Sequence, residues 1–253
     1  MKQSQFYYLL RRGLFSAGSA IIKNGLVMFN KFTTAGLNFP AQGSAEFDGA
    51  SDYIQLNDPF SYTNHTIAAW VYANDTGSNK LIFDARDAGN DGFLIWSRYS
   101  EAPVYSLNSS SIISTTTHSN EWVYVVGTYD GTTQKLYING SVNGTNTTSQ
   151  TISTTQNAAI GTQTYSPTDF FDGNLANVAI WNRALSSDEI NSVMWKSYEA
   201  LSGTESNGLQ AWYSLDDISS PAASLANMQQ LATDKNATIE NTAAITAAIN
   251  SLS

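Results

Sequence analysis

The feature that most constrains the fold is a repetition of short apolar or alternating runs between about residues 44 and 181, separated by Gly, Asn, Asp and Ser. The clearest runs are residues 52–56, 66–72, 80–84, 92–98, 122–129, 135–139 and 174–181. This pattern predicts antiparallel strands. Asp130-Gly131 and Asn139-Gly140 stand between such runs and predict hairpins, because type I′ turns require φ > 0 at both central residues.

Two of the runs are apolar on both alternating faces. In residues 66–72, one face carries Ile67, Ala69 and Val71, and the other carries Ala68, Trp70 and Tyr72. Residues 122–129 repeat this feature. Both strands are therefore predicted to be central strands covered on two sides, as in a sandwich whose concave face is partly filled.

A single helix is predicted after the last long run. Ser186 and Glu189 form a capping box, in which the serine hydroxyl accepts from the backbone of Glu189 and the carboxylate reaches back. Apolar positions follow at helical spacing as far as Leu201, and Gly203 is placed to end the helix. A final strand over residues 209–215 closes the domain. The predicted fold class is all-β, an antiparallel two-sheet jelly-roll sandwich with one short capped helix.

Three parts are expected along the chain. Residues 1–43 form an N-terminal docking arm, in which apolar side chains alternate with scattered Lys and Arg, and show neither the pattern of a signal peptide nor that of a membrane span. Residues 44–218 form the sandwich. Residues 219–253 are rich in Ala, Thr and Asn without aromatics, and a loose heptad predicts a helical oligomerisation segment. A flexible Ala-rich tail explains the same composition equally well.

The charge and cysteine content exclude several classes of function. The formal net charge is -9 and the sequence pI is near 4.5. Nucleic acid and anionic membranes need clustered Lys and Arg, so neither is an expected partner. The chain has no cysteine, which excludes disulfides, a thiolate nucleophile and Cys-ligated zinc.

Several short sequence motifs, taken in their order along the chain, resemble those of a known family. They are AEFDG at 45–49, DYIQL at 52–56, HTIAAWV at 65–71, EWVYVVGTYDG at 121–131, KLYING at 135–140, AIG at 159–161 and FDGNLANVAIWNRALS at 171–186. Together they resemble the laminin G-like domains of the concanavalin A-like superfamily, to which pentraxins are related. The resemblance covers about residues 44–215 and implies a sandwich of the lectin type.

The resemblance to pentraxins implies a ligand site between two loops, residues 87–92 and 161–165. The second loop lacks the expected carboxylates, and calcium prefers six to eight oxygen ligands, so no metal ligand is assigned and no cofactor is predicted, although a weak or structural calcium stays open. The candidate ligand-binding residues are Asn90, Asp91, Trp96, Arg98, Gln163 and Tyr165. Aromatic rings with amides and an arginine suit a sugar ring, whereas a half-buried aromatic edge is the alternative interpretation.

A structural calcium is a second open alternative. Asp48, Asp52 and Asp172 approach one another if the first and last strands of the sandwich pair, as the resemblance implies. The competing interpretation is that these aspartates accept hydrogen bonds from their own turns.

Catalysis is not expected. Related glucanases carry three acidic residues at alternate positions of one strand, and Glu46-Phe47-Asp48 lacks the third. His65 and His118 are far apart in the sequence and indicate neither a zinc site nor a Ser-His dyad.

The two terminal segments favour a structural role. The leading hypothesis is a non-catalytic subunit of a larger assembly, such as a tailed-phage virion decoration or fibre-type protein, located in the virion and homo-oligomeric, for instance trimeric. Its partners are then other protein subunits. The rival hypothesis is a free carbohydrate-binding adhesin or lectin that contacts surface glycans, and the two are compatible.

Overall fold

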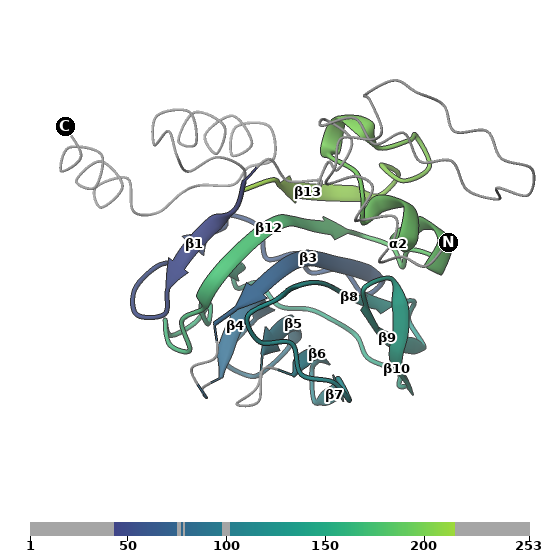
Figure 1. Cartoon of the computed structure of the whole chain (residues 1–253). Coiled ribbons are helices and arrows are strands. Elements are labelled where there is room, and N and C mark those ends of the chain that lie inside the picture. Colours follow the sequence, from purple (N-terminus) through teal and green to yellow (C-terminus); the bar gives the residue numbers. More distant parts are fainter. Residues whose placement is uncertain (1–42, 75–76, 78, 98–101, 216–253) are drawn as a thin grey trace, which may run out of the picture. The chain divides into compact units, whose positions relative to one another are not determined.

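The computed structural model describes residues 43–74, 77, 79–97 and 102–215 (Figure 1). The predicted segment 219–253 and, apart from Gly43, the predicted arm 1–43 lie outside the described residues. The strands are β1 (Ala45–Asp48), β2 (Ile54–Gln55), β3 (His65–Ala73), β4 (Lys80–Arg86), β5 (Gly92–Ser97), β6 (Pro103–Leu107), β7 (Ser110–Ile113), β8 (Trp122–Tyr129), β9 (Thr133–Ile138), β10 (Ser141–Thr147), β11 (Ala159–Ile160), β12 (Asp172–Trp181) and β13 (Leu209–Tyr213). The helices are α2 (Ser187–Val193) and the 3₁₀ turn η1 (Tyr198–Ala200).

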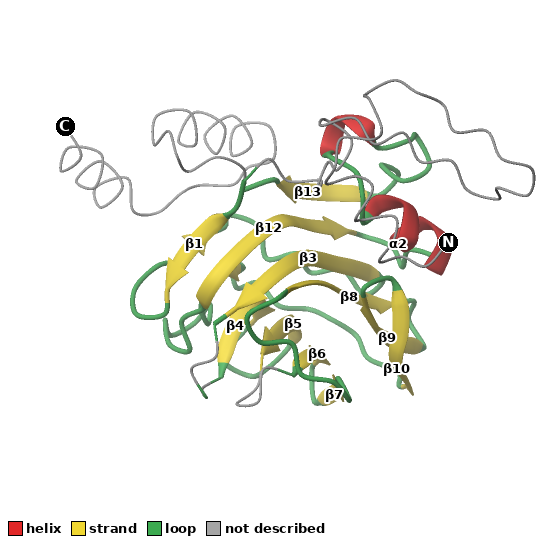
Figure 2. Ribbon diagram, in the orientation of Figure 1, coloured by secondary structure: helices red, strands yellow, loops and turns green. Residues whose placement is uncertain are grey.

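The strands form two antiparallel sheets, which Figure 2 shows as two facing layers. The seven-stranded sheet has the order β1-β12-β3-β8-β9-β10, and β13 also pairs with β12. The six-stranded sheet has the order β2-β11-β4-β5-β6-β7. The predicted all-β two-sheet sandwich is confirmed, and β3 and β8 are central strands as expected.

Two different strands pair with the same edge of β12. β1 pairs with the first part of β12, where Ala45 lies opposite Leu175, and β13 pairs with the later part, where Tyr213 lies opposite Val178. Between the two, the β12 register shifts and Asn177 adopts a φ of 48°. The first and last described strands therefore share a single neighbour.

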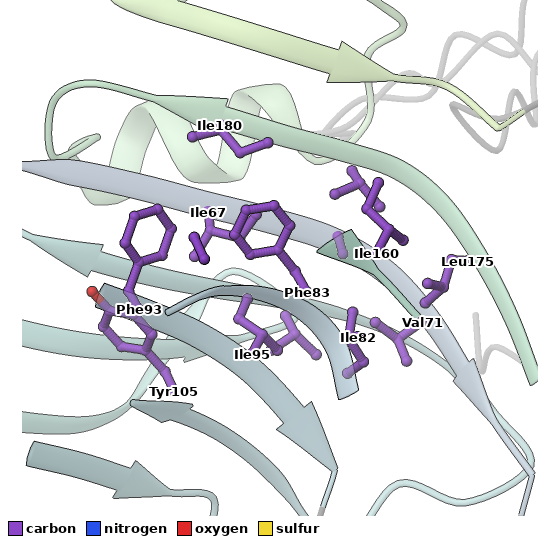
Figure 3. Close-up of a cluster of buried hydrophobic side chains, with 14 of the residues drawn as sticks. Ile67, Val71, Ile82, Phe83, Phe93, Ile95, Tyr105, Ile160, Leu175 and Ile180 are labelled. Atoms are coloured by element: carbon purple, nitrogen blue, oxygen red, sulfur yellow. The ribbon is translucent and has the colours of Figure 1, made fainter. Parts of the chain in front are cut away.

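The core lies between the two sheets (Figure 3). Alternate residues of each strand point inward, including Ile67 and Val71 from β3 and Phe83 from β4, and all three are almost fully buried. Full burial of such a side chain stabilises the fold by about 1.5–3 kcal/mol. This interface between the sheets holds the strands that carry the site.

A buried polar pair lies within this apolar core. The His65 ring stacks on Phe93 at 3.8 Å, its Nδ1 lies 2.9 Å from the Tyr62 carbonyl oxygen, and its Nε2 lies 2.6 Å from the Tyr105 hydroxyl. Burial lowers the pKa of His65 to about 4, so the ring is neutral at neutral pH, with Nδ1 as donor and Nε2 as acceptor. A Cβ at position 127 would lie 2.4 Å from the Tyr105 ring, so Gly127 gives that ring its room.

The predicted helix start is confirmed. Ser186 Oγ accepts from the Glu189 backbone at 3.2 Å, and the Glu189 carboxylate accepts from the Ser186 backbone at 2.8 Å. Arg183 also donates to this carboxylate, and its hydrogen bonds are the main reason that the pKa of Glu189 falls to about 2. The cap is thus a charged three-residue unit.

The predicted helix end is wrong. α2 stops at Val193, eight residues before the expected Leu201. Ser197 is extended, with φ -84° and ψ 169°, and the Met194 carbonyl accepts from the Trp70 indole at 3.1 Å. A tertiary hydrogen bond therefore takes the place of the next helical turn.

The two predicted hairpins differ. Asn139 and Gly140 have φ of 49° and 78°, as a type I′ turn requires. At the other hairpin only Gly131 has a positive φ, and the Asp130 carboxylate accepts from the backbone of Thr132 and Thr133. That connection is a three-residue loop shaped by the aspartate side chain.

Candidate functional site

The two predicted ligand loops meet at the end of β4. Phe83 and Ala85 belong to the core, so Asp84 and Arg86 project from the outer face of the six-stranded sheet. Loop 161–165 reaches them through Thr164, whose hydroxyl donates to the Arg86 carbonyl at 2.6 Å. Loop 87–91 reaches them through Asn90, since Arg86 Nη1 donates to Asn90 Oδ1 at 3.0 Å. Arg86 therefore joins both loops.

Arg86 is held from below by a buried carboxylate. Asp84 has no exposed surface and accepts from Arg86 Nε at 2.9 Å and from the Arg86 backbone at 3.0 Å. Burial raises the pKa of Asp84, and the hydrogen bonds and charge of Arg86 oppose that rise. The Thr164 backbone donates to the same carboxylate at 3.4 Å. The site thus contains a fixed positive group whose counter-ion lies in the interior.

The acidic side chains of the first loop are used within the chain. The Asp87 carboxylate accepts from the backbone of Gly89 at 2.8 Å and of Asp91 at 2.9 Å. The Asp91 carboxylate accepts from the backbone and the hydroxyl of Ser153. Calcium requires several carboxylate oxygens aimed at one point. These residues therefore do not fit a pentraxin-like calcium site.

The second loop presents an aromatic ring beside an amide. Tyr165 is 37% exposed, and its hydroxyl accepts from the Gln163 side chain. The Gln163 carbonyl oxygen in turn accepts from the Thr168 hydroxyl at 2.6 Å. The amide is fixed on both sides, so the phenol group has a defined position at the surface.

The predicted residue Trp96 does not lie beside Asn90. On β5, Gly92 lies opposite Arg86 next to the loop, whereas Trp96 lies opposite Leu81 near the other end of the strand. Four residues of strand separate Gly92 from Trp96 by about 13 Å. Arg98 lies outside the described residues.

Asp48 and Asp172 lie opposite each other because β1 pairs with β12. Asp48 accepts from three backbone N–H groups, those of Ala50, Ser51 and Asp52. Its hydrogen bonds with Ser51 and Ala50 lower the pKa of Asp48 to about 2. This is the geometry of a carboxylate that shapes its own turn. Over the described ranges, no group of three or more His, Cys, Asp or Glu is arranged to hold a metal ion.

Sequence reasoning missed Asp84 and Arg86, which organise the site. A signal for them exists. The two charges are spaced i, i+2 at the end of an apolar strand, so they share its outer face. The apolar part of this run predicts the strand, and its polar end carries the site.

No helix in the described part of the chain is both long and apolar enough to span a bilayer. A family profile described as the concanavalin A-like lectin/glucanases superfamily matches residues 48–191, which is more than half of the chain. No curated protein matches.

A solved structure with a TM-score above 0.5 shares the fold. A candidate carbohydrate-binding protein from Bacteroides ovatus superposes with a TM-score of 0.58 at 18% identity, covering 71% of this chain and 53% of its own. This chain therefore spans about half the length of that protein. A heptameric SAP-like pentraxin from Limulus polyphemus gives a TM-score of 0.49 at 17% identity, over 59% of this chain and 80% of its own. The CBM40 of a Ruminococcus gnavus sialidase gives 0.48 at 13% identity, over 61% and 97%.

Proposed function

Since the chain belongs to the concanavalin A-like lectin/glucanase superfamily, we propose that it is a carbohydrate-binding protein without catalytic activity. The ligand contacts a surface on the outer side of the six-stranded sheet, called the loop surface below. The loop surface consists of Arg86, Asn90, Gln163 and Tyr165. The observation that carries the proposal is the arrangement in which Arg86 joins both loops beside an exposed, hydrogen-bonded tyrosine.

The chemistry of the loop surface suits a sugar. A sugar ring offers an apolar face of C–H groups and an edge of hydroxyls. The exposed Tyr165 ring matches the apolar face. Arg86 supplies donors, and the Asn90 and Gln163 amides supply both donors and acceptors. A concave or looped site with a few fixed polar groups is the usual form of a small-molecule site.

Two further features support binding without metal or hydrolysis. The carboxylates that would hold calcium are occupied by backbone groups and by Arg86. A glycosidase needs two carboxyl groups that flank the scissile bond, one of them as a proton donor. Asp84 is buried under Arg86, and Asp87 and Asp91 serve their own loops, which leaves this surface without such a pair. The Bacteroides ovatus protein with the same fold is named for carbohydrate binding, which agrees with the proposal.

A glycan array with the full chain is the first test, followed by calorimetry of any hit with and without a chelator. We expect Tyr165→Ala to weaken binding at least tenfold. Tyr198→Ala should leave binding unchanged, because Tyr198 is also an exposed aromatic but lies outside the loop surface. Binding that disappears with the chelator would contradict the metal-free site. Release of reducing sugar from a bound glycan would contradict the absence of catalysis.

The assembly hypothesis remains a prediction. It rests on residues 1–43 and 219–253, and on no contact of the sandwich. Mass photometry of the full chain and of a chain truncated after residue 218 tests it. A trimer that becomes a monomer on truncation supports an oligomeric virion-type subunit, whereas a monomer in both cases supports a free lectin.

A further inference from the structure

A second set of aromatic and polar side chains lies in one row across the seven-stranded sheet. Strand registers place Glu46 of β1 opposite Asn174 of β12, Asn174 opposite Tyr72 of β3, and Tyr72 opposite Trp122 of β8. These four residues are called the strand row. Neighbouring strands are about 4.8 Å apart, so the row is about 14 Å long.

The strand row faces away from the core. Val71 and Ala73, on either side of Tyr72, belong to the core, and so does Val123 beside Trp122. Side chains alternate along a strand, so Tyr72 and Trp122 project from the opposite, outer face. The loop surface lies on the outer side of the other sheet. The two surfaces therefore face in opposite directions across the sandwich, whose layers are seen in Figure 2.

The aromatic half of the row forms a platform. The Tyr72 and Trp122 rings contact each other with centroids 5.8 Å apart and planes inclined by 58°. Both side chains are half-buried, so their positions are restrained by packing while part of each ring reaches the surface. Rings held on strands keep their geometry better than rings on loops.

The polar half of the row supplies hydrogen-bonding groups. Asn174 is half-buried and donates from Nδ2 to the Ser44 hydroxyl at 3.3 Å, which orients its amide. Glu46 is exposed at the end of the row. An amide and a carboxylate beside two aromatic rings offer stacking for the C–H face of a sugar and partners for its hydroxyls.

The charge around the strand row favours a neutral polysaccharide over an anionic one. The adjacent row of the same face carries Asp48 opposite Asp172, and no Lys or Arg stands in either row. The sequence as a whole has a formal net charge of -9. An anionic polysaccharide is repelled by such a surface, whereas a neutral chain is not.

We infer that the strand row is a second binding surface, specific for neutral polysaccharide chains. It does not depend on the loop surface. With both surfaces occupied, one sandwich contacts two sugar chains on opposite sides and links them.

The test is affinity electrophoresis of the full chain in native gels that contain a neutral β-glucan, galactomannan or xylan, with alginate as the anionic comparison. We expect retardation in at least one neutral gel and none in alginate. Trp122→Ala and Asn174→Ala should each reduce the retardation at least fivefold in a Tyr165→Ala background, where the loop surface is disabled. Trp195→Ala is the matched control, because Trp195 is 56% exposed and contacts Trp70 outside the row.

Circular dichroism checks that each variant is folded, and if Trp122→Ala does not fold, Asn174→Ala and Glu46→Ala carry the test. The inference is overturned if no neutral polysaccharide retards the Tyr165→Ala chain, or if Trp195→Ala reduces retardation as much as the row variants. Loss of all binding on Tyr165→Ala alone would overturn the strand row and leave the proposed function intact. Binding lost with the row variants and unaffected by Tyr165→Ala would place the sugar site on the strand row and remove the loop surface.

Discussion

The two outer faces of the sandwich are covered by different chemistry. On the seven-stranded sheet, α2 lies over the strands (Figure 1) and buries Ile190 and Val193, and Met194 is held by the Trp70 indole. On the six-stranded sheet, loop 161–165 lies over Asp84 and Arg86 through hydrogen bonds. In an apolar cover each buried side chain contributes its own stabilisation. A hydrogen-bonded cover is stabilising only while each buried polar group keeps its hydrogen-bond partner. Substitutions on the two faces separate these two behaviours.

The largest effect is expected on the polar side. Arg86→Met removes the partner of a fully buried carboxylate, and breaking such a pair destabilises by about 3 kcal/mol. Adding Asp84→Asn should restore most of the lost stability, because the uncompensated charge is then gone. Urea denaturation of both variants measures this. A double variant no more stable than Arg86→Met would show that packing around the pair, and not its charge, holds the loops.

On the apolar side, a substitution under α2 should destabilise the protein, and no second substitution should restore its stability. Ile190 is 1% exposed under α2, and Ile190→Ala is expected to lower the free energy of unfolding by about 2–3 kcal/mol, because burial is lost and a cavity remains. Asp188→Ala, on the exposed side of the same helix, should change it by less than about 0.5 kcal/mol. Equal effects of the two substitutions in denaturation curves would mean that α2 does not pack as a cover.

A pH series distinguishes the carboxylates of the two faces. Burial would raise the pKa of Glu205, but hydrogen bonds led by Lys196 outweigh it, and the pKa falls to about 2 from its usual 4.5. The stability that Glu205 contributes beside α2 is therefore complete above pH 4.5 and lost as the pH falls toward 2. The pKa of Asp84 is raised, so the folded state takes up its proton first and acid does not weaken the loop side through this group. His65, with a pKa near 4, adds a separate loss between pH 6.5 and 4.

Glu205→Gln should accordingly cost about 1–2 kcal/mol at pH 7 and less at pH 3, because at pH 3 the unfolded chain, with the usual pKa of 4.5, has taken up the proton while the folded carboxylate, with a pKa of about 2, is still ionised. Denaturation of both proteins at the two pH values measures the difference. A cost that does not depend on pH would show that the Lys196–Glu205 charge pair is not its source.

The smallest effect on stability is expected for Tyr165→Ala. Tyr165 is 37% exposed, so we expect the free energy of unfolding to fall by less than about 1 kcal/mol while glycan binding falls. A large loss of stability would mean that Tyr165 holds loop 161–165 in place. A loss of glycan binding would then follow from the damaged loop and not from a lost contact with the ligand.

The strands that could be predicted from the sequence are those with dense apolar periodicity. β3 and β8 are apolar on both faces, and the structure places them at the centre of the seven-stranded sheet. β7 was missed because Ser110–Ile113 is only four residues long and shows no alternation, and β10 was missed because Ser141–Thr147 is largely polar. Their strand state comes from pairing with β6 and β9. The helix start was predictable from local side chains. Its end was not, because it depends on Trp70, more than 120 residues earlier.

The two loops of the candidate site were predicted through the family resemblance and not from closeness in the sequence. Asn90 and Gln163 lie on two loops that the structure joins through Arg86 and Thr164. Trp96 follows Asn90 closely in the sequence, but an extended strand carries it to the other end of β5. The strand row is a property of register across four strands, and no spacing within one segment encodes it.

The shared edge of β12 determines how this sandwich can be joined to other protein. β13 ends opposite Val178 and β1 begins opposite Leu175, three positions apart on the same strand, or about 10 Å. The chain thus enters and leaves the domain at neighbouring points, and β13 and β1 follow one another like two halves of a single strand. A short linker between their ends would preserve all strand pairings of a circular permutant. The same geometry would allow the sandwich to be inserted into a surface loop of a host protein without moving the two ends of that loop apart.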